Sequence, residues 1–178
     1  MGRLIDLYLA GPLFNVAERR HNSTLEAELI GVAKVKGIDL KITSPQRKAL
    51  ERFMQSEGRF DVAGIVYDCV KDSSNKDVIV CNLDGTDADS GTAVEYGIAV
   101  GQRVAQEILK KNKVKIKVPQ VITYRTDFRT APEKEVGVNA MLRAEETTHI
   151  YHPCFSVELE EFEQFYQELA TKIINSIN

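Results

Sequence analysis

Short apolar stretches alternate with longer amphipathic stretches along the chain. The apolar stretches are rich in β-branched residues, which is typical of strands buried on both faces of a parallel sheet. The longer stretches repeat apolar residues at three- and four-residue steps, which predicts helices. We expect strands at residues 4–10, 38–44, 78–81, 120–124 and 147–151. We expect helices at residues 15–36, 46–57, 60–72 and 157–177, one after the third strand, and a short one opening at 139–142.

Strands and helices that alternate in this way predict an α/β fold. We expect a single doubly wound, flavodoxin- or Rossmann-like domain over residues 1–178, with a parallel five-stranded sheet flanked by helices. A chain of 178 residues can bury one substantial core and is short for two. The sequence has no G-x-G-x-x-G after the first strand and no G-K-[ST], so this architecture does not imply a dinucleotide or triphosphate site.

Three aspartates crowd the segment after the third predicted strand. Asp84, Asp87 and Asp89 lie there among glycines, Gly91 included. In doubly wound sheets, ligands bind outside the carboxyl ends of the strands. We therefore expect this polar segment to carry binding residues.

A helix is predicted directly after the aspartates. Thr92 and Glu95 have the spacing of a capping box, which places the helix start at Thr92 and Glu95 in the first turn. There the helix macrodipole favours the ionised form of Glu95. Glu95 could do no more than close the capping box. However, an ionised carboxylate beside a protonatable one suits glycosyl transfer, in which one attacks the anomeric carbon and the other manages the proton of the leaving group.

The run NLDGTDADSGTAVEYGIAVG at residues 82–101 resembles the nucleoside 2-deoxyribosyltransferases. That family combines an aspartate, Gly-Thr-Ala and a glutamate at the start of a helix with small residues behind it. Three further blocks resemble the family in its own order, namely LYLAGPLF at 7–14, YRTDFR at 124–129 and NAML at 139–142. Segment 103–119 is longer than the family's usual connection, and we expect it to extend the helix by two or three turns.

The resemblance implies catalytic roles for four residues. Glu95 would be the nucleophile, the Tyr8 hydroxyl would orient it, and Asp89 or Asp68 would deliver a proton to the leaving base. The matching helix aspartate of the family contacts the base. Asp72 competes with Asp68 for that role because the spacing from Asp68 to Asp77 is one residue longer than in close relatives.

Further residues are expected to contact the substrate. Gln46 follows the second strand, where its amide could read a nucleobase edge or face water. The other expected contacts lie at the strand ends and in the late block, and they are Gly11, Asp84, Gly91, Thr92, Asn139 and Met141. In the family, the matching asparagine reaches the sugar 5′-hydroxyl across a subunit boundary, and the nearby methionine packs on the ligand. The resemblance therefore implies a homo-oligomer built from dimers, up to a hexamer, in which Asn139 completes a neighbouring site.

The implied reaction moves 2-deoxyribose between nucleobases by a retaining double displacement through Glu95, with slow hydrolysis as a side reaction. Its substrates would be 2′-deoxyribonucleosides and free nucleobases. One alternative is a 2′-deoxynucleoside 5′-monophosphate N-glycosidase, a branch that tends to have serine where Asp89 stands, because a carboxylate repels the phosphate. The other is a catalytically silent nucleoside-binding protein, which would have no use for a nucleophile.

Composition adds several exclusions. A net charge of −3 argues against a nucleic-acid surface, and no apolar stretch is long enough to span a bilayer. Three widely spaced cysteines without a C-x-x-C pair indicate neither a disulfide framework nor a zinc site, which fits a reducing cytoplasm. The reaction needs no metal or redox cofactor. We expect His21 to be a surface residue without a partner, and His149 and His152 to be structural.

Overall fold

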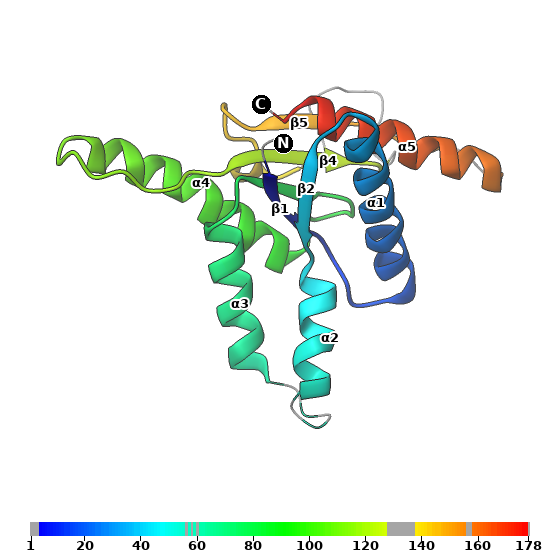
Figure 1. Ribbon diagram of the computed structural model, residues 1–178, viewed down its shortest axis with the longest axis horizontal. Helices are drawn as coiled ribbons and strands as arrows, with labels where there is room; N and C mark the ends of the chain where they lie inside the picture. The colour runs from blue at the N-terminus through cyan, green and yellow to red at the C-terminus, as the bar shows by residue number, and fades with distance from the viewer. Residues whose placement is uncertain are drawn as a thin grey trace.

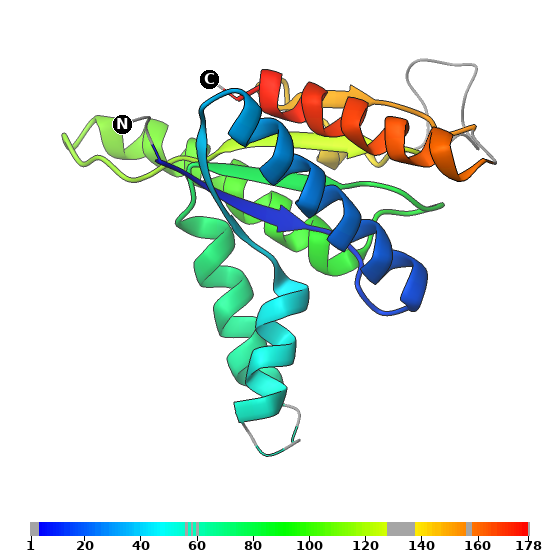
Figure 2. The ribbon, with the colours of Figure 1, turned by 45° about the vertical axis from the view of Figure 1, so that its right-hand side comes forward.

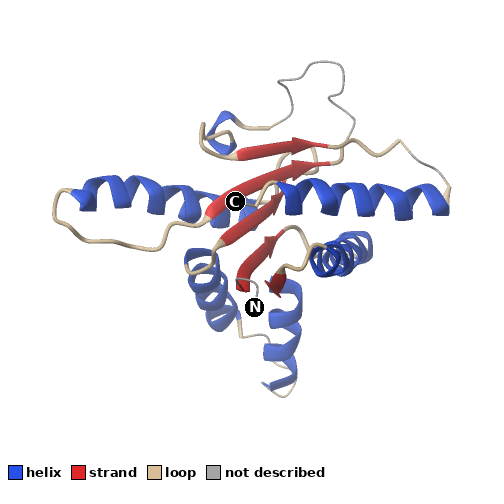
Figure 3. Cartoon of the chain, turned by 45° about the horizontal axis from the view of Figure 1, so that its top comes forward, coloured by secondary structure: helices blue, strands red, loops and turns tan. Residues whose placement is uncertain are grey.

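A parallel sheet forms the centre of the protein (Figures 1 and 3). The computed structural model describes residues 4–55, 57, 59, 61–127, 138–155 and 158–177. The strands are β1 (Leu4–Ala10), β2 (Asp39–Thr43), β3 (Val78–Asn82), β4 (Gln120–Arg125) and β5 (Thr148–Tyr151). They pair in parallel in the order β2-β1-β3-β4-β5. This is the strand order of flavodoxin-like sheets, and it confirms the predicted fold class.

Helices cover both faces of the sheet (Figures 1 and 2). The helices are α1 (Val16–Val35), α2 (Pro45–Gln55), α3 (Val62–Ser74), α4 (Ser90–Lys110) and α5 (Leu159–Asn175), with the short 3₁₀ helix η1 (Ala140–Leu142). Helices α1 and α5 pack together on one face, and α4 covers the other face with α3 and η1 beside it. Helices α2 and α3 run side by side away from the sheet.

Alternating side chains of β1 contribute to two different cores. Leu7 and Leu9 belong to the apolar cluster under α1 and α5, whereas Tyr8 and Ala10 belong to the cluster under α4. This follows from the two-residue period of a strand. Residues of β3 alternate in the same way, and all five are buried, as its apolar sequence predicted. Tyr8 therefore lies on the side of the sheet that α4 covers.

Helix α4 begins earlier than the sequence suggested. Its N-cap is Asp89, whose Oδ2 accepts hydrogen bonds from the Thr92 backbone N–H at 2.8 Å and the Thr92 hydroxyl at 3.0 Å. The predicted capping box between Thr92 and Glu95 is therefore wrong, because Thr92 is already inside the helix. Glu95 consequently lies in the second helical turn. The predicted extension is confirmed, since α4 continues to Lys110, about two turns past Gln102 (Figure 1).

His21 is not a surface residue without partners. Its Nδ1 lies 2.9 Å from the Tyr166 hydroxyl of α5, and its Nε2 lies 2.9 Å from the Tyr124 hydroxyl of β4. Its ring also stacks on that of Tyr124. The polar sequence around His21 concealed this site, because both partners come from distant parts of the chain. The prediction of a solvent-facing His21 is wrong.

The remaining elements lie close to their predicted ranges. Residues 128–129 of the YRTDFR block, residues 56 and 60 of two predicted helices and residue 157 of the last predicted helix lie outside the described residues. Within the described ranges, no helix combines the length and apolar character needed to cross a bilayer.

Candidate active site

The site is built where β1 meets β3, near the start of α4. These two strands are neighbours, and the order of the sheet reverses between them, which is where doubly wound proteins bind ligands. Tyr8 on β1 pairs in register with Ile79 on β3. The loop after β3 ends at Asp89, which caps α4. The structure thus brings together side chains of β1 and α4 that are far apart in the sequence.

Glu95 and Tyr8 form the central contact of the site. The Tyr8 hydroxyl donates a hydrogen bond to Glu95 Oε1 at 2.6 Å, the contact that the family resemblance implied. Both side chains are almost completely buried. A short bond from a phenol to a buried carboxylate fixes the direction in which the carboxylate points.

Burial raises the pKa of Glu95 to about 7. The hydrogen bond from Tyr8 and the nearby Cys69 thiol act in the opposite direction, and the negative charge of Asp89 adds to the increase. The expectation that the helix macrodipole keeps Glu95 ionised is therefore wrong. The field of a helix end falls off within the first turn, and Glu95 lies in the second turn in a desolvated position.

Tyr8 and Cys69 both remain protonated donors beside Glu95. Burial and the charge of Glu95 raise the pKa of Tyr8 far above its usual value. Burial likewise raises the pKa of the Cys69 thiol to about 11. Neither group is therefore a nucleophile near neutral pH, which leaves Glu95 as the ionisable group at this position.

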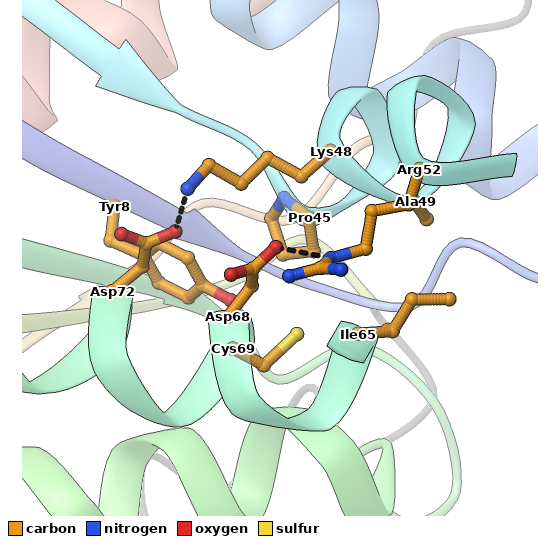
Figure 4. A pocket seen from close by; sticks show the side chains of 9 residues that line it. All are labelled: Tyr8, Pro45, Lys48, Ala49, Arg52, Ile65, Asp68, Cys69 and Asp72. Atoms are coloured by element: carbon orange, nitrogen blue, oxygen red, sulfur yellow. Dashed lines mark hydrogen bonds and ion pairs between the residues drawn. The ribbon is translucent and has the colours of Figure 1, made fainter. Parts of the chain in front are cut away.

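A small pocket opens beside this contact, between α2 and α3 (Figure 4). Asp68 faces it and forms an ion pair with Arg52, with Oδ2 at 2.5 Å from Arg52 Nε. Asp72 pairs across the same gap with Lys48. The residues that line the pocket are Tyr8, Pro45, Lys48, Ala49, Arg52, Ile65, Asp68, Cys69 and Asp72. Both candidate base-contacting aspartates therefore lie on the pocket that adjoins Tyr8.

The two aspartates have different surroundings. The Arg52 guanidinium lowers the pKa of Asp68, and Lys48 and Lys71 act in the same direction. Asp72 is more deeply buried and also lies 3.8 Å from the buried Lys76 ammonium. Asp72 is thus part of an internal charge network, whereas Asp68 is the more accessible carboxylate of the two.

Asp84 is engaged with the loop after β4. Its Oδ1 accepts backbone hydrogen bonds from Thr126 at 2.5 Å and Asp127 at 2.9 Å, and its Oδ2 accepts one from the Thr126 hydroxyl at 2.7 Å. These bonds join the ends of β3 and β4. In the structure Asp84 therefore organises the strand ends, and a direct substrate contact from it stays a prediction.

The predicted glycines lie where backbone must approach other groups closely. A Cβ on Gly11 would lie 3.2 Å from Asn22 Oδ1 and 3.2 Å from Asn82 Cβ. Gly91 lies in the first turn of α4, where a Cβ would be 3.1 Å from Asp89 Oδ2. Gly11 thus leaves room for Asn22 and Asn82 at the strand ends, and Gly91 leaves room for the Asp89 side chain that caps α4.

Gln46 is tied to α1. Its Nε2 donates to the Ser23 hydroxyl at 3.0 Å, and its Oε1 accepts from Asn22 Nδ2 at 3.4 Å. Gln46 is not among the residues that line the pocket beside Tyr8. Both of its observed hydrogen bonds go to α1, and a contact with a nucleobase edge stays a prediction.

The family-model comparison covers most of the chain. The model of the nucleoside 2-deoxyribosyltransferase family matches residues 7–165. The chain belongs to the nucleoside 2-deoxyribosyltransferase family. The matched range includes Tyr8, Asp68, Asp89 and Glu95, the four residues with predicted catalytic roles.

One solved structure supports the fold that this family membership implies. A conserved protein from Enterococcus faecalis V583 is 18% identical, with a TM-score of 0.52 over 94% of this chain and 99% of that chain. An azoreductase from Bacillus anthracis str. Sterne is 11% identical over 96% and 99% of the two chains, with a TM-score of 0.48. At 18% identity the first similarity shows the fold alone, and the second, with a TM-score below 0.5, carries no argument about this chain. No curated protein matches the chain.

The late block that resembles this transferase family lies on η1. Asn139 Oδ1 accepts a hydrogen bond from the Met141 backbone N–H at 3.0 Å, so Asn139 caps the short helix. The Met141 side chain is 83% exposed. Neither residue lines the pocket beside Tyr8.

Sequence reasoning did not find Lys48, Arg52 and Cys69 in this transferase-family site. A signal for two of them exists, because Lys48 and Arg52 are four residues apart on α2, as Asp68 and Asp72 are on α3. Two such pairs on adjacent helices form a complementary ladder. For Cys69 no signal beyond its position next to Asp68 exists. Among the described side chains, His, Cys, Asp and Glu do not gather into a group of three that could hold a metal ion.

Proposed function

We propose that the protein transfers a 2-deoxyribosyl group between nucleobases, with Glu95 as the nucleophile. The observation that carries this proposal is the buried Glu95 carboxylate held by Tyr8 at 2.6 Å in a chain of this family. A carboxylate that burial poises near neutral pH and that a donor orients is suited to attack an anomeric carbon.

The proposed reaction has two displacements at C1′. In the first, a carboxylate oxygen of Glu95 forms a bond to C1′ while the bond from C1′ to the base nitrogen breaks, and the base leaves with a proton from Asp89 or Asp68. In the second, a nitrogen of an incoming base attacks C1′, the ester bond to Glu95 breaks, and the base nitrogen loses its proton to the same carboxylate. Two inversions give net retention. Attack by water on the ester gives slow hydrolysis.

The proposed activity is expected to rise with pH. Only ionised Glu95 can attack, and burial places its pKa at about 7, so protonation at lower pH removes the nucleophile. We expect kcat/KM for base exchange to increase about tenfold per pH unit below this value and to level off above it. The measurement is a pH profile from about pH 5 to about pH 9. A profile that is already level at the lower end would contradict this assignment.

We also propose that the protein is a homo-oligomer built from dimers, in which Asn139 and Met141 reach a neighbouring site. Two features support this. Met141 is largely exposed, and α4 carries the exposed apolar residues Val94, Val104 and Ile108 on one stripe. Exposed apolar surface of this kind marks an interaction site.

Mixed oligomers test this shared site. Oligomers that contain both Glu95→Gln and Asn139→Ala subunits should recover activity that neither variant shows alone, because some sites then combine an intact Glu95 with an intact Asn139. The measurement is the rate of base exchange by co-purified mixed oligomers. If mixing recovers nothing although the subunits associate, each site is complete within one subunit.

The function itself is tested by incubating the protein with deoxyinosine in the presence or absence of adenine. Base exchange predicts deoxyadenosine only when adenine is present. If hypoxanthine appears equally in both reactions and no new nucleoside forms, transfer is wrong. Deoxynucleoside 5′-monophosphates are then the next substrates, because the alternative hydrolase acts on them. We expect them to react poorly, since the carboxylate of Asp89 would face the phosphate.

A further inference from the structure

Two ion pairs close one side of the pocket beside Tyr8 (Figure 4). Arg52 Nε lies 2.5 Å from Asp68 Oδ2, and Lys48 pairs with Asp72. The cations come from α2 and the carboxylates from α3. Each carboxylate therefore meets a cation that reaches across the pocket from α2 (Figure 4).

Arg52 is held from a second direction. Its Nη1 lies 2.9 Å from Asp61 Oδ2, while Asp61 Oδ1 accepts the Gly64 backbone N–H at 3.0 Å and so caps α3. A Cβ on Gly64 would lie 2.3 Å from Arg52 Nη1 and 2.0 Å from Asp61 Oδ2. The guanidinium thus occupies space that only a glycine leaves open. A planar guanidinium bound by two carboxylates has little freedom to turn away.

This arrangement restricts what Asp68 can do. An ionised carboxylate accepts hydrogen bonds and has no proton to give. The positive groups that face Asp68 are Arg52 and Lys48 from α2 and Lys71 from its own helix, and all three favour its ionised form. The ion pair occupies Oδ2, which leaves Oδ1 as the oxygen that can meet a ligand in the pocket.

We infer that Arg52 is a positioning residue that keeps Asp68 an ionised hydrogen-bond acceptor, so that Asp68 binds an N–H group of the nucleobase and does not protonate the base. The inference rests on the proposed function and refines it. The ligand class is a nucleobase that presents a ring N–H or amino group to α3.

Substitution of Arg52 distinguishes the acceptor role of Asp68 from an acid role, because the two roles predict changes in different kinetic constants. If Asp68 is an acceptor, Arg52→Gln should raise KM about tenfold and change kcat much less, because a charge-assisted hydrogen bond to the bound base weakens. This loss should grow at lower pH, where Asp68 now takes up a proton. Arg52→Lys should recover most of the affinity. If Asp68 is the acid, Arg52→Gln should raise kcat and leave KM unchanged, since more Asp68 is then protonated at neutral pH.

Arg47→Gln is the matched control, because Arg47 lies on the same helix and pairs with Glu26 away from the pocket. It should behave as the wild type in both constants. Asp68→Asn adds a second variant, for which the acceptor role predicts a raised KM with most of kcat kept. A fall in kcat of about 100-fold or more at unchanged KM would overturn the inference.

Equilibrium binding of free adenine separates this inference from the proposed function. Titration calorimetry of adenine into wild type, Arg52→Gln and Arg47→Gln needs no turnover. If the wild type exchanges bases but all three proteins bind adenine equally, the inference fails and the function stands. If the wild type exchanges no base but Arg52→Gln alone loses about tenfold in affinity, the function fails and the inference stands. If no protein binds adenine, the inference fails, and the exchange of bases alone decides the function.

Discussion

Replacing Glu95 with glutamine is expected to lower kcat for base exchange by at least ~10³-fold. The glutamine amide is nearly the same shape as the carboxylate and can still accept the hydrogen bond from Tyr8, but it cannot form the ester with C1′. The measurement is the rate of deoxyadenosine formation from deoxyinosine and adenine. Glu107→Gln, at an exposed position of the same helix, is the matched control and should keep full activity.

The same variant is expected to be more stable than the wild type at neutral and higher pH. The folded protein raises the pKa of Glu95 from 4.5 to about 7, so it binds this proton more tightly than the unfolded chain does. Stability is therefore lost as the pH rises between these two values, and a neutral glutamine removes that loss. We expect a gain on the order of 1–3 kcal/mol above pH 7 by chemical denaturation. A variant that loses activity together with stability would indicate a structural role for Glu95.

Replacing Tyr8 with phenylalanine is expected to lower kcat by roughly 10- to 100-fold, because Glu95 loses the donor that orients it. The hydrogen bond from Tyr8 lowers the pKa of Glu95, so its removal should move the acid limb of the pH profile to higher pH. The shift should be about one pH unit, which corresponds to one charge-assisted hydrogen bond. The measurement is the pH dependence of kcat/KM for both proteins.

Tyr96→Phe is the matched control for this second prediction. Tyr96 is also buried, on α4 itself, and its hydroxyl accepts the Ala144 backbone N–H at 2.8 Å. Its removal should cost stability and leave the acid limb in place. An acid limb that moves to lower pH in Tyr8→Phe would contradict the conclusion that the hydrogen bond from Tyr8 lowers the pKa of Glu95.

The fold could be predicted because its determinants are local. The apolar, β-branched run at 78–81 can bury all of its side chains only inside a sheet covered on both faces, and every residue of β3 is buried in the structure. The alternation of such runs with helical patterns then fixes a parallel sheet. The Tyr8 contact with Glu95 followed from the family resemblance.

Features that depend on competition between neighbours or on distant partners could not be predicted. Asp89, Ser90 and Thr92 are all residue types that cap helices, and the sequence does not tell which one does; the structure selects Asp89. That choice moves Glu95 out of the first turn, and burial, which the sequence did not show, raises its pKa. Arg52 was missed for a related reason, because its partners Asp61 and Asp68 meet it only after α2 folds against α3.

The most direct test of the proposed mechanism is the mass of the protein during turnover. Protein mixed with deoxyinosine and no acceptor base is quenched in acid, and intact mass and peptide mapping follow. Our mechanism predicts a species heavier by one deoxyribosyl group, carried on Glu95, that disappears when adenine is added before the quench and is absent from Glu95→Gln. Base exchange without any such species, or with the group on another residue, would contradict the role of Glu95 as the nucleophile.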